Sequence, residues 1–159
     1  MIVHELTAAD VDWARDFMTR VAGASRMVSR GRIHECHLLP GFYTEDAERR
    51  RTAILTYRID AAGMEVVSLY ADDRGRGYGT ALLAAASERA RREGCRRLWL
   101  VTTNDNVPAQ RFYEARGMRV AAVHEGAVDA ARRDLKPEIP PHGVGGVAIH
   151  DEIELEEVW

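Results

Sequence analysis

Residues 72–79 read DDRGRGYG and follow the apolar stretch MEVVSLYA at 64–71. Hydrophobic side chains then recur with a helical period from about Thr80 to Glu93, and Gly94 is suited to end that helix. The glycines therefore lie between a buried strand and the first turn of a helix. Backbone N–H groups at such a turn, together with the helix dipole, favour an anion such as a diphosphate.

The glycine loop has two interpretations when it is considered alone. Glycines let a phosphate approach the main chain, and Arg74 and Arg76 add charged donors, but a tight turn that binds nothing needs the same residues. The sequence lacks GxxxxGK[ST], and glycines at 75, 77 and 79 do not fit GxGxxG. A Walker-type nucleotide site is therefore excluded, and NAD or FAD is not expected.

Hydrophobic patterns on either side of the loop predict further elements. Alternation of Val147, Ile149, Ile153 and Leu155 with His150, Glu152, Glu154 and Glu156 predicts a strand with one buried and one solvated face. Strands and helices in mixed order favour an α/β fold with a partly parallel sheet. The predicted strands are 2–6, 51–59, 64–71, 97–103, 118–124 and 146–156, and the predicted helices are 11–22 with Asp10 as cap, 80–93, and 106–116 with Asn106 as cap and Gly117 at the end.

The composition is that of one globular domain, which we expect to span residues 1–159. Hydrophobic residues make up 46% and charged residues 30% of the chain, and the net charge is −3. A nucleic-acid-binding protein would show a basic surplus, and a transmembrane helix would need roughly 18 consecutive apolar residues. Two cysteines and an N-terminus without signal-peptide features indicate a reducing compartment, so we expect a cytoplasmic protein.

Two motifs together resemble the GNAT superfamily of N-acyltransferases. Arg74-x-x-Gly77-x-Gly79 is similar to the loop with which that family binds the diphosphate of acetyl-CoA, and Asn106-x-x-Ala109-x-x-Phe112-Tyr113 is similar to its segment beside the pantetheine. The resemblance implies an α/β (α+β sandwich) GNAT fold, with a mixed central sheet of six to seven strands and helices on both faces. It also implies acetyl-CoA as cosubstrate, bound by Leu69, Tyr70, Ala71, Arg74, Gly75, Arg76, Gly77, Tyr78, Gly79, Thr80, Asn106 and Ala109.

Two residues are candidates for acid–base chemistry. Strict alternation puts Glu65 on one face with Val67, Leu69 and Ala71, where apolar neighbours would raise the pKa of a carboxyl toward the range of a general base. Some family members carry their base there; a solvated or arginine-paired carboxylate and a water chain are the alternatives. Tyr113 resembles the tyrosine that donates to the CoA sulfur, and the alternative is a packed aromatic residue with its hydroxyl at the surface.

Other polar residues are given simpler interpretations. Asn106 could contact the pantetheine or only cap its helix. The run His34-Glu35-Cys36-His37 lacks the spacing of a zinc site, so no metal is expected, while His34 or Glu35 could line an acceptor pocket. The arginine runs at 49–51 and 89–97 are interpreted as solvated charge.

These observations predict an N-acetyltransferase that passes the acetyl group of acetyl-CoA directly to a primary amine in a ternary complex. We expect a small-molecule amine acceptor, since no adjoining module would recruit a larger one, and no nucleic-acid or membrane partner. Members of the family are often dimers, so the resemblance is compatible with a homodimer. The alternatives are a GNAT-fold domain that binds acyl-CoA as a sensor without catalysis, and an arginine-rich RNA-binding protein.

Overall fold

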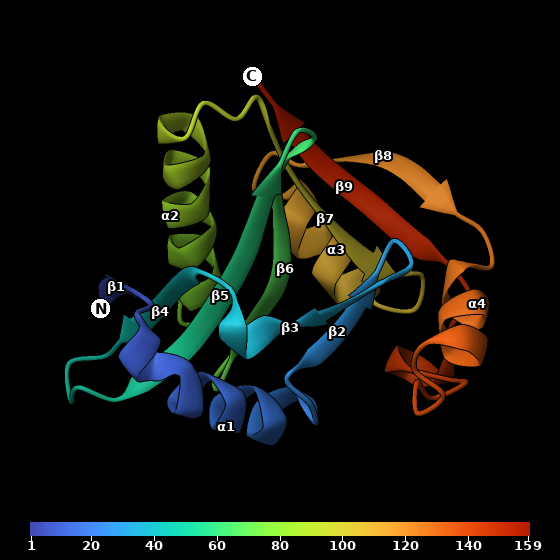
Figure 1. Cartoon of the computed structure of the whole chain (residues 1–159), viewed down its shortest axis with the longest axis horizontal. Helices are drawn as coiled ribbons and strands as arrows, with labels where there is room; N and C mark the ends of the chain where they lie inside the picture. The colour runs from blue at the N-terminus through green and yellow to red at the C-terminus, as the bar shows by residue number, and fades with distance from the viewer. The chain divides into compact units, whose positions relative to one another are not determined.

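The computed structural model describes all of residues 1–159 and contains a mixed sheet of seven strands in the order β1-β4-β5-β6-β7-β9-β8 (Figure 1). Its strands are β1 Ile2–Glu5, β4 Gly41–Glu45, β5 Arg51–Asp60, β6 Gly63–Ala71, β7 Arg97–Thr103, β8 Arg119–His124 and β9 Glu152–Val158. The helices are α1 Val11–Ala22, α2 Tyr78–Arg92, α3 Val107–Glu114 and α4 Ala127–Asp134. The predicted fold class, a mixed sheet of six to seven strands flanked by helices, is confirmed.

Short elements complete the chain. Strands β2 Arg26–Ser29 and β3 Arg32–Glu35 form a separate two-stranded sheet. Single 3-10 turns occur at η1 Ala8–Asp10, η2 Cys36–Leu38 and η3 Val144–Gly146. None of the helices combines the length and the hydropathy that a membrane span requires.

The chain divides into two compact units, which are described separately. The first consists of Met1–Met27 and Glu35–Leu98, and the second consists of Val28–His34 and Trp99–Trp159.

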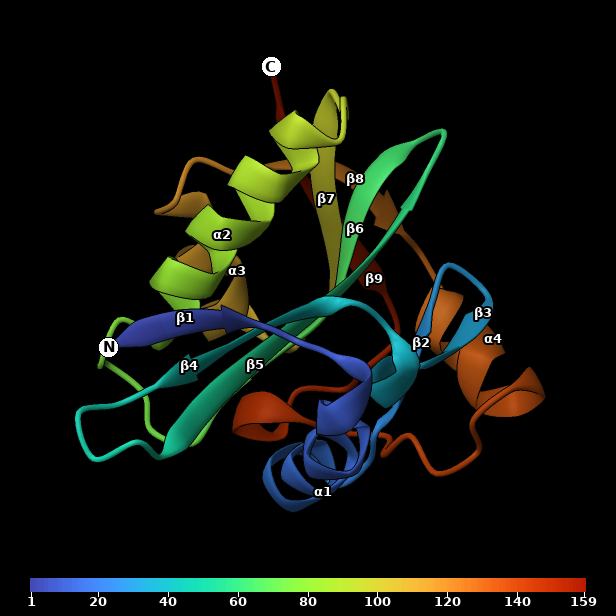
Figure 2. The same cartoon turned by 60° about the vertical axis from the view of Figure 1, so that its left-hand side comes forward.

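In the first unit, α1 and α2 cover opposite faces of the antiparallel strands β1, β4, β5 and β6 (Figure 2). Ile54 of β5 is fully buried in one cluster with Phe17 and Met18 of α1. Tyr57 lies three residues further along β5 and therefore on the other face, where its hydroxyl accepts a hydrogen bond from Arg89 of α2 at 3.2 Å. The expectation of helices on both faces holds in this unit.

Local sequence signals account for most of this unit. The buried residues of α2 follow the predicted helical period; they are Leu82, Leu83, Ala86 and Ala90. Gly94 follows the helix with a left-handed φ of 79°. The β5–β6 hairpin lies at the predicted strands 51–59 and 64–71. Its turn is stabilised by the Ala62 N–H, which donates to Asp60 Oδ1 at 2.8 Å.

Asp10 is the N-cap residue of α1, as expected, but its side chain does not cap the helix. Its carboxylate instead accepts hydrogen bonds from the Thr7 N–H at 2.8 Å and from Arg51 Nη1 at 2.9 Å. Strand β4, around Phe42, is not among the predicted strands. Its five residues give too short an alternation to be recognised without the pairing with β5.

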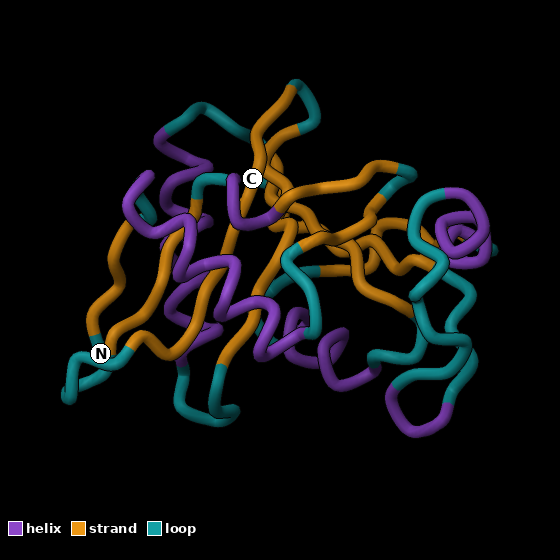
Figure 3. The backbone as a smooth tube through the Cα atoms, turned by 60° about the horizontal axis from the view of Figure 1, so that its bottom comes forward, coloured by secondary structure: helices purple, strands orange, loops and turns teal.

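In the second unit, the connection between β8 and β9 differs from the predicted strand at 146–156. It contains helical turns separated by loops (Figure 3), namely α4, an irregular segment and the η3 turn. Strand β9 begins only at Glu152. Val147 is 46% exposed, so it is not a core residue. Glu152 was predicted to face water but is buried, because its carboxylate accepts a hydrogen bond from Arg30 Nη1 at 2.8 Å and from the Arg30 N–H.

Candidate active site

The glycine loop connects β6 to α2 in a backbone conformation that favours glycine. Gly75 and Gly77 have φ angles of 79° and 80°, in the left-handed region. A Cβ atom built on either residue would have no heavy atom within 4 Å. The space next to this backbone is therefore open, as close approach of a ligand to the main chain requires.

The first turn of α2 offers hydrogen-bond donors at this loop. Gly77 is the N-cap and has no side chain that could accept from the helix. The first hydrogen bond of the helix runs from the Ala81 N–H to the Gly77 carbonyl at 3.1 Å. The N–H groups of Tyr78 and Gly79 consequently have no acceptor within the helix, and the helix dipole adds positive potential there.

The two loop arginines differ in how they are held. Arg76 Nε donates to Asp73 Oδ2 at 2.9 Å, and both side chains are exposed. Arg74 is exposed and makes no hydrogen bond or ion pair with the protein. Arg74 can therefore turn toward an anion directly, whereas Arg76 must exchange its carboxylate partner to do so.

A β-bulge in β6 changes which face its side chains occupy. Thr56 of β5 is paired with Ser68, but the next residue, Tyr57, is paired with Val66, so Val67 is an extra residue in β6. Such a bulge shifts the alternation by one residue. Nothing in the amino-acid pattern of this apolar strand reveals it.

The bulge corrects the expected surroundings of Glu65. Glu65 is paired with Arg58 of β5, and Leu69 is paired with Leu55 of the same strand. Leu55 and Arg58 are three residues apart, so their side chains point to opposite faces. Paired residues share a face, so Glu65 and Leu69 lie on opposite faces of the sheet. The expectation that Glu65 shares a face with Leu69 and Ala71 was wrong.

Glu65 is a buried, paired carboxylate. Glu65 is only 1% exposed, and Arg58 Nε donates to its Oε1 at 2.7 Å. Arg58 also donates to Asp60 Oδ2 at 2.6 Å, so one guanidinium connects two carboxylates. This is the arginine-paired arrangement that the sequence left open, and the role of Glu65 as general base stays a prediction.

Helix α3 of the second unit carries the other candidates. Asn106 caps the helix, since its Oδ1 accepts from the Ala109 N–H at 3.3 Å. Capping uses one oxygen and leaves the amide group with donors that the cap does not require. The capping role is observed; contact with a pantetheine arm stays a prediction.

Tyr113 is a partly buried residue on α3. Its ring lies edge-on to Phe112, with centroids 5.4 Å apart, and its hydroxyl makes no hydrogen bond within the protein. Burial raises the pKa of Tyr113 to about 12. The phenol is therefore protonated at neutral pH and has a donor to offer to a ligand.

The residues His34 to His37 do not form one extended run. Strand β3 ends at Glu35, and Cys36–Leu38 form a 3-10 turn. His34 Nε2 lies 2.9 Å from Ser29 Oγ across the β2–β3 hairpin, and both side chains are buried. His34 therefore faces a serine hydroxyl in its own hairpin.

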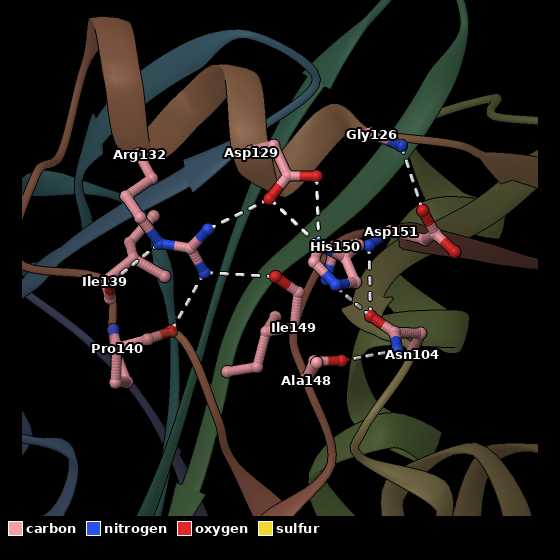
Figure 4. Close-up of polar contacts among 10 residues, drawn as sticks. All are labelled: Asn104, Gly126, Asp129, Arg132, Ile139, Pro140, Ala148, Ile149, His150 and Asp151. Carbon is pink, nitrogen blue, oxygen red and sulfur yellow. Dashed lines mark hydrogen bonds and ion pairs between the residues drawn. The ribbon is translucent and has the colours of Figure 1, made fainter.

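Sequence analysis missed a group of polar residues that hold the segment before β9 (Figure 4). Asn104 Nδ2 donates to the Ala148 carbonyl at 2.9 Å, and its Oδ1 accepts from the N–H groups of His150 and Asp151. The Arg132 guanidinium donates to three carbonyl oxygens at 2.9 to 3.0 Å, those of Ile139, Pro140 and Ile149. These side chains replace the strand pairing that the pattern predicted.

Asp105 holds the η3 turn in the same unit. Its Oδ2 accepts from the Val144 N–H at 2.9 Å, and its side chain is buried. A Cβ on Gly143 would lie 2.1 Å from that oxygen, so only glycine fits there. The signal in the sequence is the polar triplet Asn104-Asp105-Asn106 directly after a predicted strand, together with glycines 143, 145 and 146 further on.

The sequence is similar to that of known proteins. Residues 36–118 match the model of the acetyltransferase (GNAT) family. The protein YdhI of Bacillus subtilis is 41% identical over 143 residues, which cover 90% of this chain and 89% of the relative.

Solved structures are similar over nearly the whole chain. An IAA acetyltransferase from Bacillus cereus has a TM-score of 0.75 and 14% identity, with 99% of both chains covered. A GNAT family acetyltransferase from Elizabethkingia anophelis, solved with acetyl-CoA bound, has a TM-score of 0.70 and 15% identity over 99% of this chain and 97% of its own. At 14% and 15% sequence identity, the similarity to these structures shows that this chain shares their fold.

Proposed function

Because the chain belongs to the GNAT family of acetyltransferases, we propose that it transfers the acetyl group of acetyl-CoA to a primary amine of a small molecule, by direct transfer in a ternary complex. The observation that carries the proposal is the open glycine loop at the first turn of α2. It combines two N–H groups without helical acceptors, a helix dipole and the unpaired Arg74. A diphosphate is the group of acetyl-CoA that this combination would bind best.

The remaining cofactor contacts are proposed on the same basis. The loop residues from Arg74 to Thr80 would hold the diphosphate, and the backbone of Leu69, Tyr70 and Ala71 would hold the thioester and pantetheine. Asn106 and Ala109 are proposed to contact the pantetheine from the first turn of α3. The fit rests on the open space at Gly75 and Gly77, which a side chain would fill.

Tyr113 is proposed as the donor to the departing sulfur. The amine nitrogen bonds to the acetyl carbon, the carbon–sulfur bond breaks, and its electron pair goes to sulfur. With a pKa of about 12, the phenol is a weaker acid than a thiol at about 8.5, so it supports the thiolate chiefly as a hydrogen-bond donor. The nitrogen loses a further proton as the amide forms, and that proton completes the thiol.

The amine must also lose a proton before or during attack, because a primary amine has a pKa near 10.4 and is largely protonated at neutral pH. We propose Glu65 as the base that receives it, with a chain of water molecules as the alternative. The Arg58 contact weakens the case for Glu65, since a guanidinium occupies one of its oxygens. The roles of Arg58 and Glu65 can be distinguished by substituting each residue alone.

The proposal includes a cytoplasmic location, a small-molecule acceptor and compatibility with a homodimer. A domain that binds acetyl-CoA as a sensor is the second candidate, and the Arg58–Glu65 ion pair is the observation that favours it. The two candidates make the same prediction for cofactor binding and opposite predictions for turnover.

The test is acetyl transfer to a panel of small primary amines, measured together with the affinity for acetyl-CoA. Tyr113→Phe removes the hydroxyl, and we expect kcat to fall by about a hundredfold with little change in affinity. Tyr57→Phe is the matched control, because burial also raises the pKa of Tyr57, which lies in the first unit and contacts Arg89.

The outcomes separate the candidates. Turnover that falls in Tyr113→Phe and persists in Tyr57→Phe supports the enzyme with Tyr113 as donor. A further loss in Glu65→Gln supports the base, whereas unchanged turnover in Glu65→Gln supports the water chain. Tight binding of acetyl-CoA with no turnover on any amine supports the sensor, and absence of binding contradicts both candidates.

A further inference from the structure

We propose that Arg20 is a positioning residue for the glycine loop: by holding Asp72, it fixes the start of the loop for a diphosphate ligand. The proposal rests on the proposed function, because it concerns the same loop. It adds a residue of α1 that neither motif of the sequence includes. Arg20 would act through Asp72 and would not touch the ligand.

The contact between Arg20 and Asp72 is bidentate. Arg20 Nη1 donates to Asp72 Oδ1 at 2.5 Å, and Nη2 donates to Oδ2 at 3.0 Å. The guanidinium also lies over the ring of Phe17, 5.1 Å from its centroid, and Phe17 is buried. A planar, stacked guanidinium with two parallel bonds sets the orientation of the carboxylate as well as its position.

Asp72 is held in place by both its backbone and its side chain. Its N–H donates to the Thr52 carbonyl of β5 at 2.8 Å, so its backbone and its side chain are both held. Between residues 72 and 77, the only other side-chain ion pair is the one from Arg76 to Asp73, which lies within the loop. Arg20 therefore provides the only ion pair that connects this loop to the rest of the protein.

Arg20 also compensates negative charge at the start of the loop. Asp72 and Asp73 are two carboxylates directly before a segment that is suited to an anion, and both would repel a diphosphate. Arg20 pairs with the first and Arg76 with the second. The Arg20 guanidinium also lowers the pKa of Asp72, so this carboxylate is ionised at neutral pH and its charge needs a partner.

The exposure of the pair makes the proposal testable without unfolding the protein. The Arg20 side chain is 60% exposed, and exposed ion pairs contribute little to stability. A substitution at Arg20 should therefore change ligand affinity much more than the melting temperature. Arg15 is a matched control on the same helix, because it makes an exposed ion pair with Asp12 at 2.7 Å.

The experiment measures the dissociation constant for CoA by calorimetry in Arg20→Gln, Asp72→Asn, the double variant and Arg15→Gln. We expect Arg20→Gln to weaken binding about five- to tenfold and Arg15→Gln to leave it unchanged. The double variant should bind as Asp72→Asn does, because Arg20 acts only through Asp72. In turnover, KM for acetyl-CoA should rise in Arg20→Gln while KM for the acceptor stays constant.

A second measurement decides the proposal without any ligand. Amide hydrogen exchange in the free protein should be faster at residues 73–77 in Arg20→Gln than in the wild type and Arg15→Gln. Unchanged exchange at residues 73–77 would overturn the proposal. It would also be overturned if Arg20→Gln weakened CoA binding equally in the wild type and in Asp72→Asn, because Arg20 would then contact the ligand itself. If the wild type does not bind CoA, the proposed function fails, and the exchange result still decides whether Arg20 orders the loop.

Discussion

Two glycine-containing segments of this protein use glycine for different physical reasons. In residues 72–77, before α2, a Cβ on Gly75 or Gly77 would meet nothing within 4 Å. In residues 142–147, before β9, a Cβ on Gly143 would lie 2.1 Å from Asp105 Oδ2 and 2.8 Å from Ile149 Cδ1. The space beside Gly75 and Gly77 is open, whereas Gly143 is packed; Gly145 and Gly146, which follow Gly143, also have open space.

Gly77 and Gly143 show the two different requirements for glycine. At Gly77 the requirement for glycine comes from a left-handed φ of 80°, and the space beside it is empty. At Gly143 the φ angle is −128°, outside the left-handed region, and a Cβ there would meet the buried Asp105 carboxylate. Glycine content alone therefore does not indicate a binding loop. Open space beside the glycine is required as well, and at Gly77 it coincides with the first turn of α2.

The largest expected effect on stability is that of Gly143→Ala. Its methyl group would overlap the Asp105 carboxylate, and overpacking of this kind costs about 2 kcal/mol. For a chain of this size the melting temperature should fall by roughly 4–8 °C, measured by thermal unfolding. Gly145→Ala is the control, since its Cβ has open space and only the strain of a positive φ. Equal melting temperatures for wild type and Gly143→Ala would contradict the comparison.

Gly77→Ala should separate affinity from stability. The positive φ costs about 1 kcal/mol in the free protein, and the added methyl group would occupy the space proposed for the diphosphate. We expect affinity for acetyl-CoA to fall about tenfold or more, measured by calorimetry. Gly94→Ala is matched to it, with a φ of 79° and open space outside the loop. The same loss of affinity in both variants would show that strain, and not the site, causes it.

The smallest effect concerns the pH dependence of the packed segment. A hydrogen bond from His150 and the nearby Arg132 hold the pKa of Asp129 below its ordinary value of 3.8. A lowered pKa in the folded state stabilises it above about pH 4, and this contribution is lost as the pH falls through the folded-state pKa. Amide exchange at 139–151 should therefore rise below pH 4 in the wild type, and less steeply in Asp129→Asn. Identical pH profiles would exclude a contribution from Asp129.

The regular elements around the loop were predictable because their signals are local. The buried stripe of α2 follows the helical period, and the strands of the β5–β6 hairpin coincide with the predicted strands 51–59 and 64–71. The position of the glycine loop between strand and helix was likewise predictable. Asn106 was identified as a cap for the same reason, since a cap depends only on the next three residues.

The remaining features depend on residues distant in sequence. The bulge at Val67 exists only in the pairing of two strands, and it moved Glu65 to the face opposite Leu69. Glu152 is buried because Arg30 reaches it from a hairpin 122 residues earlier. The segment 139–151 resembles a strand in its alternation, but Asn104 and Arg132 satisfy its backbone groups instead. Local sequence patterns do not indicate hydrogen-bond partners that are distant in sequence.

Hydrogen exchange or amide NMR of both segments, with and without acetyl-CoA, tests the central claim most directly. The diphosphate would accept hydrogen bonds from the first turn of α2, so the amides of Gly77, Tyr78 and Gly79 should shift and be protected on binding. The amides of residues 143–147 should not change. Protection of the second segment with no change in the first, or no change in either at saturating acetyl-CoA, would contradict the account.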